Sequence, residues 1–389
     1  MVHVHGMARL GVLAVGLGIG AGWAHMPVAS ADSSGDWLSS IDSLLSGASP
    51  APATPIDLAI SFDGYSIYNG GGSAEADTNT GDYSLAIAYG DHATAIAGST
   101  GGVAVADGAD AYAGAGTLGT GDVAIADGSG ALAWAAGGNG DVAEAVGTNA
   151  DAYAGAAGMG VTGADSDTAI DIGNNSVPAS YGTDIGAYAG NSDLAGGTDG
   201  GTGVHDTAID IGNNTNDNGG DGSNDGAFAG AGGLGDGSGD GNGDTAIDVG
   251  NNSGSGFDGS FAVEGNGNYA SESGDGTGPG DYIYAGQGND NTAIGAGDTL
   301  GVDAYGGNDN YAYVDGPTDS TALAYDGNSN IASVFDPFGA TGSIDSATAG
   351  DGFSNDLADV LLAHGNATAD TANLLYDIIS LFGNFSGSF

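Results

Sequence analysis

The feature that most constrains this chain is a short unit that returns from about Gly81 to Pro337: an acidic or Asn residue, an alternating apolar stretch, then Gly. Early copies begin at Asp82, Asp122 and Asp141, and they imply a period of about 20 residues. Alternation bounded by Gly, Asn or Asp is typical of strands joined by turns. One such unit cannot bury its own face, so the repetition predicts coils that stack on one another.

A second form of the unit is more regular. It reads Asp-Thr-Ala-Ile-Asp-Ile/Val-Gly-Asn-Asn and starts at Asp167, Asp206 and Asp244, so successive starts lie 39 and 38 residues apart. An aromatic strand lies in each interval, around Tyr188 and then Phe228. The spacing leaves two alternatives: one coil spans the whole interval, or it spans half and the aromatic strands intervene between the units.

The period of two in a strand divides the first of these units between two faces. Thr168, Ile170 and Ile172 share one face, and Asp171 lies on the other with its alternate neighbours Asp167 and Ala169. The division predicts a narrow interior, with the larger apolar residues inside, and an acidic exterior.

Composition supports the same fold class. The chain has 80 Gly among 389 residues, and its apolar content leans on Ala, which suits tight corners with positive φ and a thin interior. We therefore predict an all-β protein, a repeat β-solenoid or β-roll with short flanking helices at both termini. Gaps of variable length, such as residues 232–244, leave the alternative of a largely disordered Gly/Asp-rich chain.

The organisation along the chain follows from these patterns. Residues 1–31 read as a signal peptide, with Arg9 in a short basic region, an apolar stretch and Ala29-Ser30-Ala31 before the cleavage point. Residues 32–56 read as an amphipathic helix and a Pro/Ala linker, and 57–337 as the Gly/Asp/Ala-rich β-repeat region. Residues 338–389 read as a C-terminal helical cap, with helices over 355–363 and 371–382. We expect no transmembrane anchor after signal cleavage.

Charge and residue types exclude several functions. Lys plus Arg total one, against 50 Asp plus Glu, so the chain lacks the basic patch of a nucleic-acid binder. Cys is absent, which removes disulfides and thiolate chemistry. The histidines outside the signal region, His92, His205 and His364, lie far apart and are predicted to be surface residues. No catalytic motif is present, so we expect no enzymatic activity.

All but four of the acidic residues are Asp, the carboxylate that suits turns and hard cations. If one coil spans 38 to 39 residues, Asp171, Asp210 and Asp248 form a carboxylate ladder that must take up protons or bind a cation. Oxygen-rich corners extend the calcium hypothesis, and the alternative is a solvated acidic face. These corners carry four further candidate calcium ligands, Asp217, Asp221, Asp236 and Asp240.

Three stretches resemble known families. Residues 81–158, with a Gly-x-x-Ala-x-Ala-x-Gly rhythm, resemble the head repeats of trimeric autotransporter adhesins, which are parallel β-rolls that present a binding surface outside the cell. Residues 190–244 are similar to the Gly-rich arrays of mycobacterial PGRS-type surface proteins. Gly286-Gln-Gly-Asn-Asp290 and Gly306-Gly-Asn-Asp309 are similar to the calcium nonapeptides of repeats-in-toxin proteins. This resemblance implies that Asp290 and Asp309 are candidate calcium ligands.

The resemblances and the composition together give the functional expectation. We expect a non-enzymatic repeat protein that is secreted or held at the cell envelope or surface of a bacterium, with a structural or adhesive role. Its partner would be a surface or matrix component of unknown identity, and homo-oligomerisation stays open. The alternative is a soluble calcium-binding acidic repeat protein.

Overall fold

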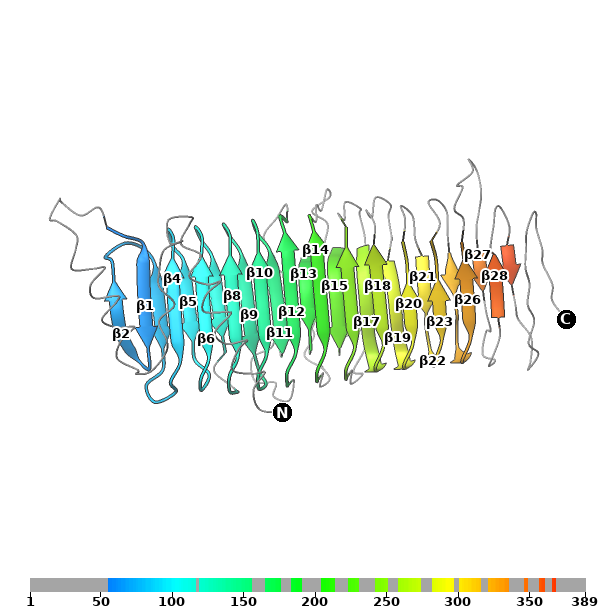
Figure 1. Cartoon of the computed structure of the whole chain (residues 1–389), viewed down its shortest axis with the longest axis horizontal. Helices are drawn as coiled ribbons and strands as arrows, with labels where there is room; N and C mark the ends of the chain where they lie inside the picture. The colour runs from blue at the N-terminus through cyan, green and yellow to red at the C-terminus, as the bar shows by residue number, and fades with distance from the viewer. Residues whose placement is uncertain are drawn as a thin grey trace, which may run out of the picture.

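Two long, mostly parallel β-sheets face each other and form an elongated rod (Figure 1). The computed structural model describes residues 55–116, 119–155, 165–175, 183–190, 204–213, 223–230, 242–250, 258–273, 282–296, 301–315, 321–335, 346–348, 357–360 and 366–368. These residues form strands and no helix. Successive strands alternate between the sheets along most of the chain, so the described part is an all-β solenoid, as predicted.

The first sheet has 14 strands, 12 of them parallel to their neighbours beyond an N-terminal hairpin. Its order is β2 (Tyr65–Asn69), β1 (Leu58–Phe62), β4 (Leu85–Tyr89), β6 (Val103–Asp107), β8 (Val123–Asp127), β10 (Val142–Val146), β12 (Thr168–Gly173), β14 (Thr207–Gly212), β16 (Thr245–Val249), β18 (Tyr269–Ser273), β20 (Thr292–Ile294), β23 (Tyr311–Tyr313), β26 (Ile331–Val334) and β28 (Leu357–Val360).

The second sheet has 15 strands. In chain order they are β3 (Glu75–Thr78), β5 (Thr94–Ala97), β7 (Tyr112–Ala115), β9 (Leu132–Ala136), β11 (Asp151–Gly155), β13 (Thr183–Ala189), β15 (Ser223–Gly230), β17 (Asp258–Asn266), β19 (Tyr282–Asn289), β21 (Gly301–Ala304), β22 (Gly307–Asn308), β24 (Ala322–Leu323), β25 (Gly327–Asn328), β27 (Ser346–Thr348) and β29 (Asn366–Thr368).

One coil contributes a strand to each sheet, and this settles the period. Asp122 and Asp141 occupy equivalent places in successive coils, 19 residues apart, in line with the predicted period. In the regular units the coil is longer: Asp167 and Asp206 are 39 residues apart, and Asp206 and Asp244 are 38 apart. The aromatic strands lie in the second sheet, so they do not separate the units of the first. The alternative of a half-length coil is therefore wrong.

Alanine is the main apolar residue of the interior between the sheets. Ala86, Ala124, Ala169 and Ala208 from the first sheet and Ala113 from the second are completely buried, and they belong to one continuous cluster that runs along the rod. Small methyl groups suit the narrow space between the two sheets, and few larger apolar side chains join the cluster, among them Ile283 and Val302. The predicted thin, alanine-filled interior is confirmed.

The predicted assignment of faces is wrong. Asp167, Ala169 and Asp171 are completely buried, whereas Ile172 is 41% exposed. The narrow interior accepts the small alanine and the short aspartate, and it sends the branched Thr, Ile and Val side chains outward. The predicted alternation is confirmed, but its larger apolar members lie outside.

Corners with positive φ recur once per coil, as the glycine content predicted. The residue before each buried corner Asp or Asn has this conformation, as in Gly140, Ser166, His205 and Gly243, with φ between 63° and 77°. The position accepts several residue types because its side chain points into open space, as at Gly243, where an added Cβ would meet nothing within 4 Å.

The two ends of the described chain are built differently from the coils between them. At the N-terminal end, β1 and β2 form an antiparallel hairpin that closes the edge of the first sheet. At the other end, the predicted helix over 355–363 is wrong, because Leu357–Val360 is strand β28 and pairs with β26. The signal peptide, the helix before residue 48 and the helix over 371–382 lie outside the described residues.

A glycine in the second sheet gives a test of how closely the coils approach. Gly226 has φ +128°, and a Cβ added there would collide with the backbone carbonyl of Gly186 in the preceding coil. We expect Gly226→Ala to lower the free energy of unfolding by about 3 kcal/mol, through overpacking and backbone strain. Urea unfolding followed by far-UV circular dichroism measures the loss. Gly243→Asn is the control and should cost less than about 1 kcal/mol, since Asn tolerates positive φ; equal losses would contradict the close approach.

Candidate functional site

The most extended polar feature of the interior is a column of corner residues, one per coil, at the start of the first-sheet strands. It runs through Asp122, Asp141, Asp167, Asp206, Asp244, Asn268, Asn291, Asn310 and Asn330, all buried. We call it the corner column. In each step the backbone N–H of one member donates to Oδ1 of the preceding member, for example from Asp206 to Asp167 and from Asp244 to Asp206, both at 2.9 Å.

The corner column changes from Asp to Asn between Asp244 and Asn268. In the Asn coils the second polar atom, Nδ2, is a donor with its own acceptors. Nδ2 of Asn268 donates to the carbonyl oxygens of Val263 at 3.3 Å and Gly288 at 3.2 Å. In the Asp coils the same place holds a carboxylate oxygen. Oδ2 of Asp141, Asp167, Asp206 and Asp244 is buried and has no hydrogen-bond partner among the residues described.

Burial raises the pKa of every aspartate in the corner column. Desolvation raises the pKa of Asp141 and Asp206 to about 8, that of Asp244 to about 7, and those of Asp122 and Asp167 to about 6. For Asp141 and Asp206 the neighbouring carboxyls of the column add to the increase, while hydrogen bonds from backbone N–H groups oppose it. The chain has one Lys or Arg in all, so it offers little basic charge to neutralise a buried carboxylate.

A second interior column contains three of the predicted calcium ligands. Asp171, Asp210 and Asp248 pair in register, and Glu272 follows them in the next coil. The predicted ladder therefore forms, but its side chains are buried between the sheets and do not face solvent. Desolvation raises the pKa of Asp171 to about 7, while hydrogen bonds from Asp151 N–H and Asn175 Nδ2 oppose the increase.

The other predicted calcium ligands lie elsewhere. Asp290 and Asp309 occupy equivalent corners of successive coils, exposed and with φ of 54° and 56°. Asp217, Asp221, Asp236 and Asp240 lie outside the described residues. Among the described residues, no three His, Cys, Asp or Glu side chains converge as a metal ion would require. Calcium binding at the corners stays a prediction.

A column of asparagine amides runs along the outside of the same corner in the C-terminal half. It comprises Asn242, Asn266, Asn289, Asn308 and Asn328, and each Nδ2 donates to Oδ1 of the next member at 2.7 to 2.9 Å. The Gly-Asn-Asp segments that resemble calcium nonapeptides belong here: Asn289 and Asn308 are amide-column members, with Asp290 and Asp309 next to them. Sequence spacing alone did not reveal this column.

Aromatic rings form a further column on the second sheet. Tyr153, Tyr188, Phe228 and Phe261 stack with ring centroids 4.9 to 5.0 Å apart and with nearly parallel planes. They form a buried hydrophobic cluster separate from the alanine core. The one-aromatic-per-interval pattern of the sequence thus becomes one continuous stack, with offset-stacking distances typical of aromatic pairs.

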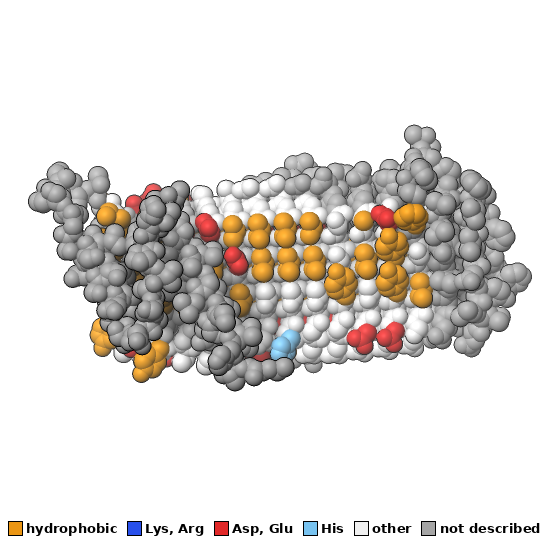
Figure 2. All heavy atoms as spheres, viewed as in Figure 1, with side chains coloured by type: hydrophobic (Ala, Val, Ile, Leu, Met, Phe, Trp, Pro, Cys, Tyr) orange, Lys and Arg blue, Asp and Glu red, His pale blue; other side chains and the backbone are white. Residues whose placement is uncertain are grey.

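The outward side chains of three successive first-sheet strands make a flat, uncharged surface. We call it the outer face, and it consists of Thr168, Ile170, Ile172, Thr207, Ile209, Ile211, Thr245, Ile247 and Val249. Equivalent residues pair in register across β12, β14 and β16. The last residue of each strand's triplet stays accessible to solvent: Ile172 and Ile211 are each 41% exposed. Figure 2 shows parallel rows of hydrophobic side chains along this flank of the rod.

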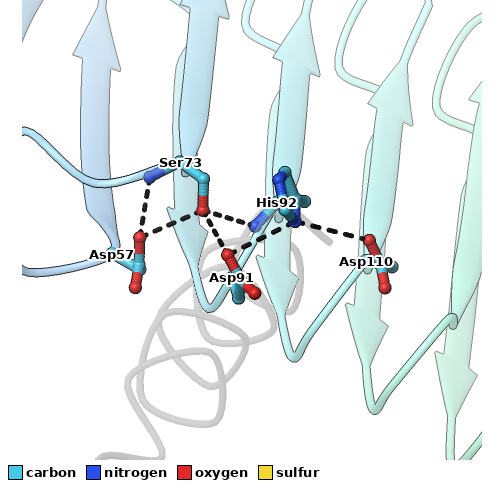
Figure 3. Close-up of polar contacts among 5 residues, drawn as sticks. All are labelled: Asp57, Ser73, Asp91, His92 and Asp110. Atoms are coloured by element: carbon cyan, nitrogen blue, oxygen red, sulfur yellow. Dashed lines mark hydrogen bonds and ion pairs between the residues drawn. The ribbon is translucent and has the colours of Figure 1, made fainter.

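Polar side chains also meet at the N-terminal corners of the second sheet (Figure 3). Ser73 Oγ contacts the carboxylates of Asp57 at 3.1 Å and Asp91 at 2.6 Å, and it accepts a hydrogen bond from the backbone N–H of His92. The His92 imidazole lies 3.3 Å from Asp91 and 3.8 Å from Asp110. His92 and His205 are exposed, as predicted, and His364 lies outside the described residues.

The buried and exposed columns can be compared within one coil. Asn268→Ala removes the acceptor for Asn291 N–H and the donor to two carbonyls, one buried and one partly buried. We expect it to lower the free energy of unfolding by about 3 kcal/mol, since each buried polar group left unpaired costs about 1–3 kcal/mol. Asn266→Ala, in the exposed amide column two residues earlier, should cost about 1 kcal/mol or less because water replaces the lost amide. Chemical denaturation of both variants checks the difference, and equal costs would contradict the burial of the corner column.

Comparison with protein-family models, with curated proteins and with solved structures finds no match to this chain. Within the described part, no helix is long and apolar enough to cross a membrane.

Proposed function

We propose that this chain is a non-enzymatic repeat protein of the bacterial surface or envelope, exported from the cell, whose rod presents the outer face for structural or adhesive contact. The observation that carries the proposal is the outer face itself. It repeats the same Thr-Ile-Ile/Val triplet on three successive strands, in register, on a flat sheet.

Charge explains why contact would use this surface. The chain carries a formal net charge of −49, so most of its surface repels anionic partners. The nine outer-face residues are uncharged, and branched apolar side chains held partly exposed in a contiguous patch are typical of interaction surfaces. The rigid parallel sheet holds them without the entropy loss of ordering a loop.

The contacts of Ser73 and His92 also favour a binding role and not a catalytic one. Ser73 and His92 are close, but the serine hydroxyl faces carboxylates and a backbone N–H, while the imidazole faces Asp91 and Asp110. An activated nucleophile needs its hydroxyl hydrogen-bonded to the imidazole base. The cluster is better suited to joining neighbouring corners.

The test places charge on the outer face. Glu144 already occupies the position that pairs with Ile170, so glutamate fits this row of the sheet. We expect the double variant Ile170→Glu/Ile209→Glu to keep its far-UV circular dichroism spectrum. Retention of chain-coated beads on envelope fractions of the producing cell should fall at least about tenfold, as a loss of about 1.4 kcal/mol or more implies.

The control adds the same charge at exposed corners. Ser129→Glu/Thr148→Glu should leave bead retention unchanged, because these residues lie away from the outer face. Cell fractionation of the unaltered chain is the second measurement. Recovery in the cytoplasm alone, or equal retention of both double variants, would overturn the proposal.

A further inference from the structure

In its Asp coils the corner column has a carboxylate oxygen, Oδ2, at the place where its Asn coils have an amide donor, Nδ2. In the Asn coils, Nδ2 of Asn268 and Asn291 donates to the carbonyls of Val263 and Gly286, at 3.3 and 3.1 Å. These carbonyls belong to one row of the second sheet, in which Gly230 pairs with Val263 and Val263 with Gly286. The row therefore offers acceptors to whichever atom of the corner column faces it.

In the Asp coils the facing atom is Oδ2. A Cβ added at Gly230 would collide with both Oδ2 of Asp206 and the carbonyl oxygen of Gly190, so these two oxygens lie beside the same glycine. A Cβ added at Gly155 would likewise collide with Oδ2 of Asp141 and the carbonyl oxygen of Ala136. Two acceptor oxygens held beside the same buried residue repel each other unless one of them carries a hydrogen.

We propose that Asp141, Asp206 and Asp244 are proton-binding sites, held in the folded rod as neutral carboxylic acids whose Oδ2–H donates to this row of carbonyls, as Asn Nδ2–H does in the later coils. Oδ1 keeps its role as acceptor for the N–H of the next coil. Folding of these coils then takes up protons from solvent, and alkaline solution removes them.

The acidic groups around the three aspartates favour their neutral form, because neighbouring negative charges repel one another. Asp122 and Asp167 lie on either side of Asp141, and Asp167 and Asp244 on either side of Asp206. The second interior column adds further acids on the same strands, Asp171, Asp210, Asp248 and Glu272. The row of the second sheet beside the corner column is uncharged and includes Gly230 and Val263. The charges next to Asp167 are those of the half-buried Asp165 and the exposed His205.

The consequence for stability has a definite sign. The pKa of each site is raised by burial, from 3.8 to about 8 for Asp141 and Asp206 and about 7 for Asp244. Between these limits the folded chain holds protons that the unfolded chain has released, so stability is greatest in acid and falls as pH rises to about 8. For each such site, the folding equilibrium constant falls by up to about tenfold for every unit by which pH rises between these limits.

The experiment measures urea unfolding of the full chain from pH 6 to pH 9, where ordinary Asp and Glu are already ionised. We expect the unfolding midpoint to fall as pH rises. In Asp206→Asn/Asp244→Asn the decline should be shallower, because Asn supplies the donor permanently. The matched control, Asp110→Asn/Asp309→Asn, changes two exposed residues and should keep the full decline. His205→Asn separates the histidine contribution.

Infrared spectroscopy of the unaltered protein provides a readout that does not depend on any variant. A carbonyl stretching band of un-ionised carboxylic acid should be present in the folded protein at pH 6, and it should weaken as pH rises to 9. It should also be weaker in Asp206→Asn/Asp244→Asn at pH 6. No acid band in the folded chain at pH 6, or an equal pH slope in the buried and exposed double variants, would overturn the proposal.

Discussion

In-register stacking of parallel coils governs the chemistry of this protein. Adjacent strands lie about 4.8 Å apart, so the nearest neighbour of most side chains along the rod is the same position of the next coil. Aromatic rings then stack on rings, as in Tyr188 and Phe228, and amides hydrogen-bond to amides, as in Asn289 and Asn308. Both arrangements are favourable without help. A carboxylate stacked on a carboxylate is favourable only when something removes its charge, which is why the interior aspartates are the chemically demanding part of the fold.

Repetition in the sequence explains which predictions succeeded, and the thin interior explains which one failed. The period of the corner residues, the positive-φ corners and the pairing of Asp171 with Asp210 all follow from repetition in the sequence, and the structure confirms them. The sidedness could not be predicted by the usual rule that larger apolar residues lie inside. Ala169 and Ile170 are both apolar, and alternation alone does not say which is buried. The separation of the sheets decides it, and that separation is a property of all coils together, set by glycine and alanine.

The ends were harder to predict because they do not repeat. The β1–β2 hairpin occurs once, with its tight turn at Asp63 and Gly64, so no periodicity in the sequence predicts it. The sequence predicts a helix where Leu357–Val360 forms a strand, because a short apolar run fits both periods. Its pairing with β26 supplies the tertiary context that a single segment lacks. The amide column was missed for a related reason, since its members become neighbours only once the coil length is known.

The outer face and the acidic columns belong to the same strands, and this links contact to proton binding. Asp171 lies between Ile170 and Ile172 in β12, so successive residues of one strand place a carboxyl inside and a branched apolar side chain outside. The same alternation holds at Asp210 in β14 and Asp248 in β16. A buried charge that distorts these strands would also disturb the flat register of the outer face. The coils beyond Asn268 carry neutral amides at the corner, and there the outward positions change to Tyr269 and Ser271. The two ends of the rod therefore differ. The repeated apolar surface lies on coils whose corner residue is Asp, whereas the coils that follow have Asn at the corner, which does not titrate, and a different outer surface.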